Sequence, residues 1–275
     1  MQKFDQIIFW CEFPKKINPK DIKLINFKTE AYVTSKDVKE YDFWKKKLSN
    51  KNIHWGAWPT LPLKEGYWFS KYTKIECINK LKKFNGINIK IDIEPPIPHT
   101  SELFKKFSLY LLVKDAILET LRHKIDTRKY LWETINYLKS KKIIISGFPF
   151  PNFMSSSYGD DYKKFNKDHY RNHFLYITFF QNKLLRKLIM FYYYLYVKSK
   201  IKKYETHKLY FAIGCVGKGI FSTEPIYNNL EEFEKDLNRF LKWGIRNLVI
   251  FNLEGILNKE EPDKWVNSLR VRLKQ

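Results

Sequence analysis

Short apolar and β-branched segments recur along this 275-residue chain at regular intervals. Runs of this length and composition, several with apolar and polar residues in alternation, are typical of β-strands. They predict eight strands, at residues 7–13, 29–33, 53–58, 87–94, 142–147, 174–180, 209–215 and 248–253. The sixth run also fits the first turns of a helix, so a different sixth strand or an incomplete barrel stays open.

Segments with apolar residues three and four positions apart separate most of these runs and predict helices. They cover residues 36–48, about 101–138 with a break, 182–204, 230–240 and 260–273. In the long helix at 182–204, Leu184, Leu188, Tyr192 and Leu195 form an apolar stripe that we expect to pack on the core. Strand alternating with helix eight times, without a linker-like segment, predicts a single-domain (β/α)8 TIM barrel over residues 1–275.

Residues 86–96 form the most regular stretch of the chain. Isoleucine occupies every second position from 87 to 93, and Lys90, Asp92 and Glu94 fall on the opposite face of the strand. A second carboxylate two residues away raises the pKa of its neighbour, and this is one way to form a general acid that works near neutral pH. The alternative is an edge strand with a solvated polar face.

Acidic residues also occur where other strands end, and these ends converge at one face of a barrel. Glu12 shares a strand face with Trp10, and Glu254 shares one with Asn252. Each residue alone could be structural, but together they predict a cluster of carboxyl groups. Catalytic candidates are therefore Glu94, Asp92, Glu254 and Glu12.

Aromatic residues accompany the acids. Trp55, Trp58 and Trp68 lie on or just after the third strand, and Tyr176 lies on the predicted sixth strand. Flat rings beside carboxylates suit sugars, whose C–H faces stack on the rings. The predicted substrate-binding residues are Trp10, Trp55, Trp58, Trp68, Tyr176 and Asn252. The alternative for the tryptophans is that they cap the barrel core.

The Asp92-x-Glu94 pair at the end of the fourth strand resembles the motif of glycoside hydrolases of the chitinase-like family 18 and the lysozyme-like family 25. The resemblance implies that Glu94 protonates the leaving oxygen, while Asp92 orients a substrate N-acetyl group or supports the acid. Family 18 has further acids upstream, where this chain has Ile87 and Lys90. Glu94-Pro95 also resembles the Asn-Glu-Pro acid/base motif of other barrel glycosidases, although Ile93 replaces the Asn. The nucleophile of those enzymes would lie on strand seven, and the nearest candidate here, Glu224, comes well past that strand.

The sequence therefore predicts a glycosidase of carbohydrate metabolism that cleaves a poly- or oligosaccharide without a cofactor or metal. Glu94 is the acid, Asp92 assists it, and Glu254 or Glu12 is the second carboxylate. One alternative is a metal-dependent TIM-barrel hydrolase or isomerase with Asp92, Glu94, Glu12, Glu254 and His54 as ligands. Another is a non-catalytic barrel that binds carbohydrate or an anionic polymer, because Lys90 could keep both acids ionised.

The formal net charge is +22, with 51 Lys and Arg against 29 Asp and Glu. Lysines are scattered and accompany many Ile, Asn, Phe and Tyr residues, which share AT-rich codons, so we do not expect nucleic-acid binding. Three widely spaced cysteines indicate a reducing compartment. Because we find no signal-peptide pattern or membrane-length apolar run, we expect a cytoplasmic protein without a membrane partner. The sugar, the linkage and the oligomeric state are not predicted.

Overall fold

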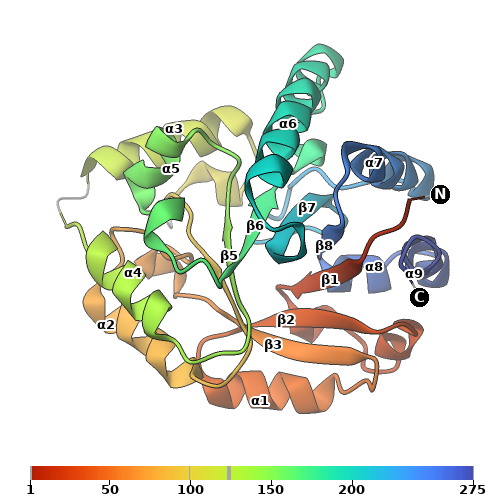
Figure 1. The fold of residues 1–275 in the computed structure, drawn as a ribbon, viewed down its shortest axis with the longest axis horizontal. Helices are drawn as coiled ribbons and strands as arrows, with labels where there is room; N and C mark the ends of the chain where they lie inside the picture. The colour runs from red at the N-terminus through yellow and green to blue at the C-terminus, as the bar shows by residue number, and fades with distance from the viewer. Residues whose placement is uncertain (1, 99, 123–124, 275) are drawn as a thin grey trace.

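Eight parallel strands close into a barrel in the computed structural model, which describes residues 2–98, 100–122 and 125–274 (Figure 1). The strands are β1 (Gln6–Cys11), β2 (Thr29–Ser35), β3 (Ile53–Pro59), β4 (Ile89–Asp92), β5 (Ile143–Gly147), β6 (Tyr170–Phe174), β7 (Leu209–Cys215) and β8 (Asn247–Phe251). Each strand pairs with the next in sequence, and β8 pairs with β1 in the register Val249 to Ile8. The predicted TIM-barrel fold is confirmed.

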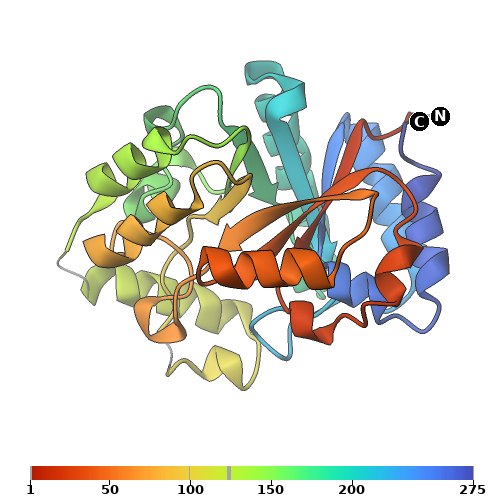
Figure 2. The ribbon, with the colours of Figure 1, turned by 90° about the horizontal axis from the view of Figure 1, so that it is seen from below.

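Helices cover the outside of the barrel, with α1, α2 and α4 at the bottom and left of Figure 1 and α6, α7 and α9 at the top and right (Figures 1 and 2). They are α1 (Val38–Lys47), α2 (Ile75–Asn79), α3 (Leu109–Arg122), α4 (Arg128–Tyr137), α5 (Asn152–Tyr158), α6 (Lys183–Lys203), α7 (Leu230–Trp243), α8 (Leu253–Leu257) and α9 (Pro262–Arg270). The chain ends lie side by side (Figure 2), and Phe4 forms a parallel bridge with Leu273. Among the described residues, no helix is long and apolar enough to cross a membrane.

Side-chain caps set the beginnings of several helices. Asp37 accepts a hydrogen bond from the Glu40 amide at the start of α1, and Asn229 accepts one from the Glu232 amide at the start of α7. Such caps satisfy backbone donors that have no partner inside the helix. Gly244 ends α7 with φ of 88°, a conformation that glycine adopts without strain.

The alternation of residues on β4 separates two apolar layers. Ile89, Ile91 and Ile93 belong to the core between the sheet and the helices. Lys90 and Asp92 point the other way, into the barrel, where the apolar cluster includes Trp10, Tyr32, Trp58, Phe174 and Tyr210. The predicted two-faced strand is therefore present, although its ladder ends at Asp92.

The predicted sixth strand is wrong in position. β6 covers Tyr170–Phe174, and Ile177–Phe179 form a short 3-10 helix, η7. Arg171 and His173 gave β6 a polar appearance, but both are buried with partners. Arg171 pairs with Asp160 at 3.0 Å, and the His173 ring is hydrogen-bonded to the Tyr196 hydroxyl at 3.0 Å. The barrel therefore has the different sixth strand that the sequence left open.

The expected packing of the α6 stripe on the core is also wrong. Tyr193 and Val197 are the buried residues of α6, whereas Leu184, Leu188 and Leu195 are exposed. The helix therefore contacts the barrel through a different face and presents its apolar stripe to solvent.

Candidate active site

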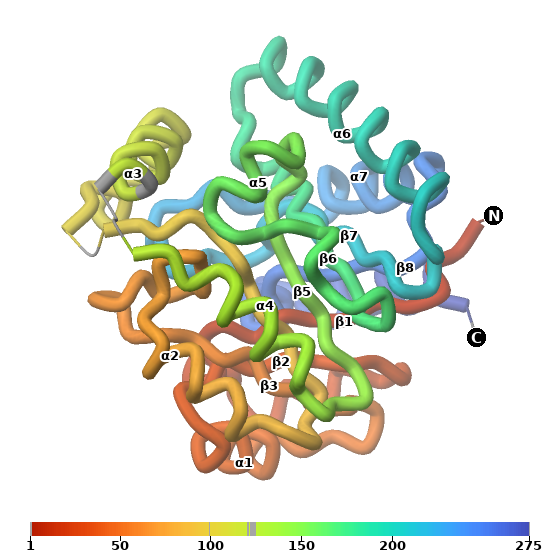
Figure 3. Tube along the Cα trace, turned by 60° about the vertical axis from the view of Figure 1, so that its left-hand side comes forward, coloured from red at the N-terminus to blue at the C-terminus, as the bar shows by residue number. Residues whose placement is uncertain are grey.

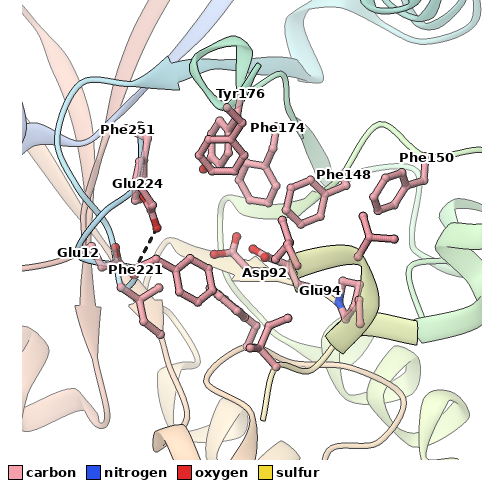
Figure 4. A pocket seen from close by; sticks show the side chains of 18 of the residues that line it. Glu12, Asp92, Glu94, Phe148, Phe150, Phe174, Tyr176, Phe221, Glu224 and Phe251 are labelled. Carbon is pink, nitrogen blue, oxygen red and sulfur yellow. Dashed lines mark hydrogen bonds between the residues drawn. The ribbon is translucent and has the colours of Figure 1, made fainter. Parts of the chain in front are cut away.

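A pocket lies at the carboxyl ends of the barrel strands, and its floor carries ionisable groups (Figure 4). The groups are Glu12, Lys90, Asp92, Glu94 and Glu224. Figure 4 shows Glu12 and Glu224 on one side, Asp92 and Glu94 on the other, and a row of aromatic rings along the pocket. Residues from α3 also line it, so this helix lies against the pocket.

Lys90 and Asp92 form an ion pair inside the barrel. Lys90 Nζ donates to Asp92 Oδ2 at 2.6 Å, and both side chains are almost fully buried. The ammonium also lies 3.1 Å from the centroid of the Trp58 ring. Burial lowers the pKa of Lys90 to about 8, against the opposing effect of the nearby carboxylates. Burial raises the pKa of Asp92, and Lys90 is the largest influence that opposes this rise.

Glu94 is buried in the pocket next to this pair. Its backbone is fixed by Phe69, which donates to the Asp92 carbonyl at 3.1 Å and accepts from the Glu94 amide at 3.0 Å. Burial and the Asp92 charge raise the pKa of Glu94 well above its ordinary value, while Lys90 lowers it by less. The carboxyl group therefore favours its protonated form, which is the state of a general acid.

Glu12 follows β1 and lines the pocket. The Tyr67 hydroxyl donates to Glu12 Oε1 at 3.0 Å, and Tyr67 has a φ of 63°, which is unusual for a bulky residue. Burial raises the pKa of Glu12 well above its ordinary value, followed by the charges of Glu224 and Glu254.

Glu224 lies in the loop after β7. The amides of Gly219 and Phe221 donate to its two carboxyl oxygens at 3.0 and 3.2 Å. Burial raises its pKa to about 7, and the two amide donors act in the opposite direction. Donors of this kind stabilise a carboxylate. Glu224 therefore has two donors that support a negative charge, as the Lys90 ammonium does for Asp92.

Glu254 and Asn252 do not line the pocket. Glu254 Oε1 accepts the amides of Glu12 and Phe13 at 3.0 and 2.7 Å, so it holds the loop that carries Glu12. Burial raises its pKa to about 7. Asn252 accepts from the Gly255 amide at 2.8 Å and caps α8. Both residues position the backbone at this end of the barrel.

The predicted aromatic residues divide into two groups. Trp58, Trp68 and Tyr176 line the pocket, and Trp10 lies beneath it with its ring 4.7 Å from Lys90 Nζ. Trp55 belongs to the outer core between the sheet and the helices, so its ring does not reach the pocket. The alternation of β3 explains the difference, because Trp55 and Trp58 are three positions apart and therefore face opposite sides of the strand.

His54 does not join the carboxyl groups suggested with it for a metal site. His54 lies at the opposite end of the barrel, where its ring contacts Asn88 Nδ2 at 3.2 Å. In the described part of the chain, no group of three or more His, Cys, Asp or Glu residues could hold a metal ion.

The sequence analysis did not assign Glu224 to the site, and it did not find most of the apolar lining. The missed aromatic residues are Phe148, Phe150, Phe174, Phe179, Phe221 and Phe251. Glu224 carried two signals, since it follows a strand whose extension contains Gly217 and Gly219 and it precedes Pro225. The Glu-Pro pair and the glycines indicate a tight loop at the carboxyl end of β7.

No protein-family model matches the sequence, and no curated protein matches it either. Solved structures share its fold. The PgaB (BpsB) glycoside hydrolase domain from Bordetella bronchiseptica is 11% identical with a TM-score of 0.56 and aligns over 99% of this chain and 100% of its own. A xylose isomerase domain protein from Planctomyces limnophilus is 7% identical with a TM-score of 0.51 over 98% of both chains. The chain thus forms a TIM barrel like that of a glycoside hydrolase.

Proposed function

We propose that this protein is a glycoside hydrolase that acts on a poly- or oligosaccharide, with Glu94 as the general acid. The observation that carries the proposal is the environment of Glu94: a buried carboxyl group with a raised pKa, in a pocket that also holds Glu12, Asp92 and Glu224. Pairs of titratable groups with different environments are typical of acid–base sites. The aromatic lining of the pocket suits the apolar faces of sugar rings.

In the proposed reaction, Glu94 gives its proton to the glycosidic oxygen as the bond to the anomeric carbon breaks. Glu224 carries the negative charge that the reaction requires. In an inverting reaction it takes a proton from the attacking water, and in a retaining reaction it first bonds to the anomeric carbon. In the retaining case, water then gives its hydroxyl to the sugar and its proton returns to Glu94. The first anomer released, measured by NMR, distinguishes the two courses.

Asp92 offers a second source of assistance. A substrate N-acetyl group can supply the nucleophile when a neighbouring carboxylate orients it, as the family 18 resemblance implies. The ion pair with Lys90 favours the charged form of Asp92 and supports this role. This course needs Asp92 and Glu94 but not Glu224, so Glu224→Gln distinguishes it from the first.

The position of Lys90 bears on the non-catalytic alternative. Its ammonium pairs with Asp92, and its effect on Glu94 is smaller than those of burial and Asp92. Lys90 therefore does not keep both acids ionised, and this favours catalysis. The metal-dependent alternative lacks a ligand cluster among the described residues, so we do not propose it. We also propose that the protein acts in a reducing compartment such as the cytoplasm. This is supported by three buried cysteines that form no disulfide, Cys11, Cys77 and Cys215.

A turnover screen on chromogenic glycosides and polymeric glycans tests the proposal, with wild type compared to Glu94→Gln. Loss of an acid proton donor lowers the rate by about 10²–10⁴-fold while substrate binding persists. The matched control is Glu102→Gln, because Glu102 lies on the surface and outside the pocket. Turnover that is equal in wild type and Glu94→Gln, or no turnover on any glycan, overturns the proposal.

A further inference from the structure

Helix α6 presents a row of large apolar side chains to solvent. Leu184, Leu188, Phe191 and Leu195 are all at least half exposed. Their spacing of four, three and four residues places them on one face of the helix. A single exposed apolar residue needs no explanation, but a continuous stripe of four marks an interaction surface.

Helix α3 has the same feature beside the pocket. Tyr110, Val113, Ile117 and Leu121 follow a helical spacing, and each is more than half exposed. Leu112 and Ala116 of the same helix line the pocket. A helix that is apolar on both its inner and outer faces is typical of a site buried in a protein or in lipid, not of a solvated surface.

The two helices lie on one side of the molecule, together with α5 and opposite α1 (Figures 1 and 3). The pocket walls connect them. Phe107, just before α3, contacts the ring of Phe179 in η7, just before α6, with centroids 4.6 Å apart. The Tyr192 hydroxyl of α6 donates to the Pro149 carbonyl, and α5 begins three residues later with Phe153 strongly exposed. The helices that carry the exposed apolar residues are therefore linked to one another through residues at or next to the pocket wall.

The charge of α6 indicates an occupant with a negatively charged surface. Helix α6 contains no acidic residue, and the exposed Lys183 and Lys187 come directly before Leu184 and Leu188 of its stripe. The whole chain has a formal net charge of +22. Apolar side chains beside lysines on one helix face are the features of helices that lie in the headgroup region of anionic bilayers. Lysine stems reach past apolar groups to keep the ammonium at the headgroups.

We propose that the exposed faces of α3, α5 and α6 form a lipid-binding surface that seats the protein on an anionic bilayer, with the pocket mouth toward the lipid. Such a protein lies on the interface and needs no spanning helix. The pocket wall then continues into the hydrocarbon boundary through Leu112, Val113 and Phe179. This inference rests on the proposed function: the substrate is then an amphiphilic glycoside whose sugar reaches Glu94 while its apolar part stays at the rim of the pocket.

The test is sedimentation of the whole protein with phosphatidylcholine vesicles that contain or lack phosphatidylglycerol. Wild type binds the anionic vesicles at least tenfold more tightly than the neutral ones, and added salt weakens the binding. Ile117→Glu and the double variant Leu188→Glu/Phe191→Glu each lose at least tenfold in affinity. The matched control is Phe43→Glu on α1, an equally large exposed side chain on the opposite side of the molecule.

Three outcomes overturn the proposal. Wild type binds neither kind of vesicle, or Phe43→Glu weakens binding as much as the stripe variants do. Alternatively, light scattering shows a dimer that the stripe variants dissociate, which would assign the surface to a second copy. Glu94→Gln is expected to bind vesicles as wild type does, and the stripe variants to keep turnover of short water-soluble glycosides. The experiments can therefore refute the proposed lipid-binding surface without refuting the proposed catalytic function, and the reverse.

Discussion

Lys90 Nζ donates to Asp92 Oδ2 at 2.6 Å inside the barrel, and Asp92 lies two positions before Glu94 in the chain. This pair determines which of two neighbouring acids is charged. Asp92 has a cation at contact distance, whereas Glu94 has Asp92 itself as its largest charged influence. Burial raises the pKa of both carboxyl groups, but the cation beside Asp92 opposes the rise there, whereas Asp92 adds to it at Glu94, as the proposed roles of supporting carboxylate and general acid require.

Replacement of Lys90 by methionine is expected to lower the free energy of unfolding by about 3–5 kcal/mol, because it leaves the Asp92 carboxylate buried without its partner. The double variant Lys90→Met/Asp92→Asn removes both charges and is expected to recover part of the loss. Urea unfolding of the three proteins measures both effects. A single variant within about 0.5 kcal/mol of wild type would contradict the structural role of the pair.

The pH profile of kcat/KM is expected to be bell-shaped. Glu224, with a pKa of about 7, loses its negative charge as the pH falls through that value, so the rate falls on the acidic side. Glu94, whose pKa is raised, loses its proton as the pH rises, so the rate falls on the alkaline side. The residual activity of Glu94→Gln is expected to lack the alkaline limb and that of Glu224→Gln the acidic limb. An unchanged alkaline limb in Glu94→Gln would assign the acid to another residue.

Gly219→Ala is expected to lower kcat/KM by about 100-fold, since small displacements of catalytic groups have effects of this size. A Cβ at Gly219 would lie 2.7 Å from Glu12 Oε2 and 3.1 Å from Glu224 Oε1. Gly86→Ala is the control. Its added Cβ meets no atom within 4 Å, but its φ of 82° strains any other residue. We expect Gly86→Ala to lower the Tm in thermal unfolding and to keep the kcat/KM of wild type. Equal losses of kcat/KM in Gly219→Ala and Gly86→Ala would refute the effect assigned to Gly219.

Trp58→Phe and Trp55→Phe form a matched pair, because the two residues lie on one strand and face opposite sides. Trp58→Phe is expected to lower kcat/KM about tenfold, since it reduces the ring that covers the Lys90 ammonium. Trp55→Phe is expected to reduce the free energy of unfolding by about 1–2 kcal/mol and leave kcat/KM unchanged. Steady-state kinetics measures the first effect and urea unfolding the second. A loss of kcat/KM in Trp55→Phe but not in Trp58→Phe would contradict the position of the pocket.

The sequence predicted those features that depend on local periodicity. The barrel, the two faces of residues 86–96 and the meeting of Glu12 with Asp92 and Glu94 follow from alternation and from the convergence of parallel strands. The same parity rule separates Trp55 from Trp58, although the sequence analysis grouped them. β6 was misplaced because its polar residues Arg171 and His173 are buried with the partners Asp160 and Tyr196. Each partner lies on another segment, and the sequence alone does not show that the segments meet.

Glu224 could not be placed by periodicity. Its position depends on the path of the loop after β7, where amides at Gly219 and Phe221 hold its carboxyl group. The exposure of the α6 stripe was also beyond the sequence, because Leu184 and Leu188 have the same spacing whether they face a core or a bilayer. Helical periodicity identifies an apolar face but not what covers it.

The contact between Glu254 and the Glu12 amide joins residues that are 242 positions apart in the chain. During synthesis, the Glu12 loop therefore receives this support only after 242 further residues have been made. Until β8 is made, β1 also has an unpaired edge. A nascent or truncated chain that ends before Glu254 can hold β4 and its two acids but not the loop opposite them. The pocket that holds these carboxyl groups is thus completed only after Glu254 has been made.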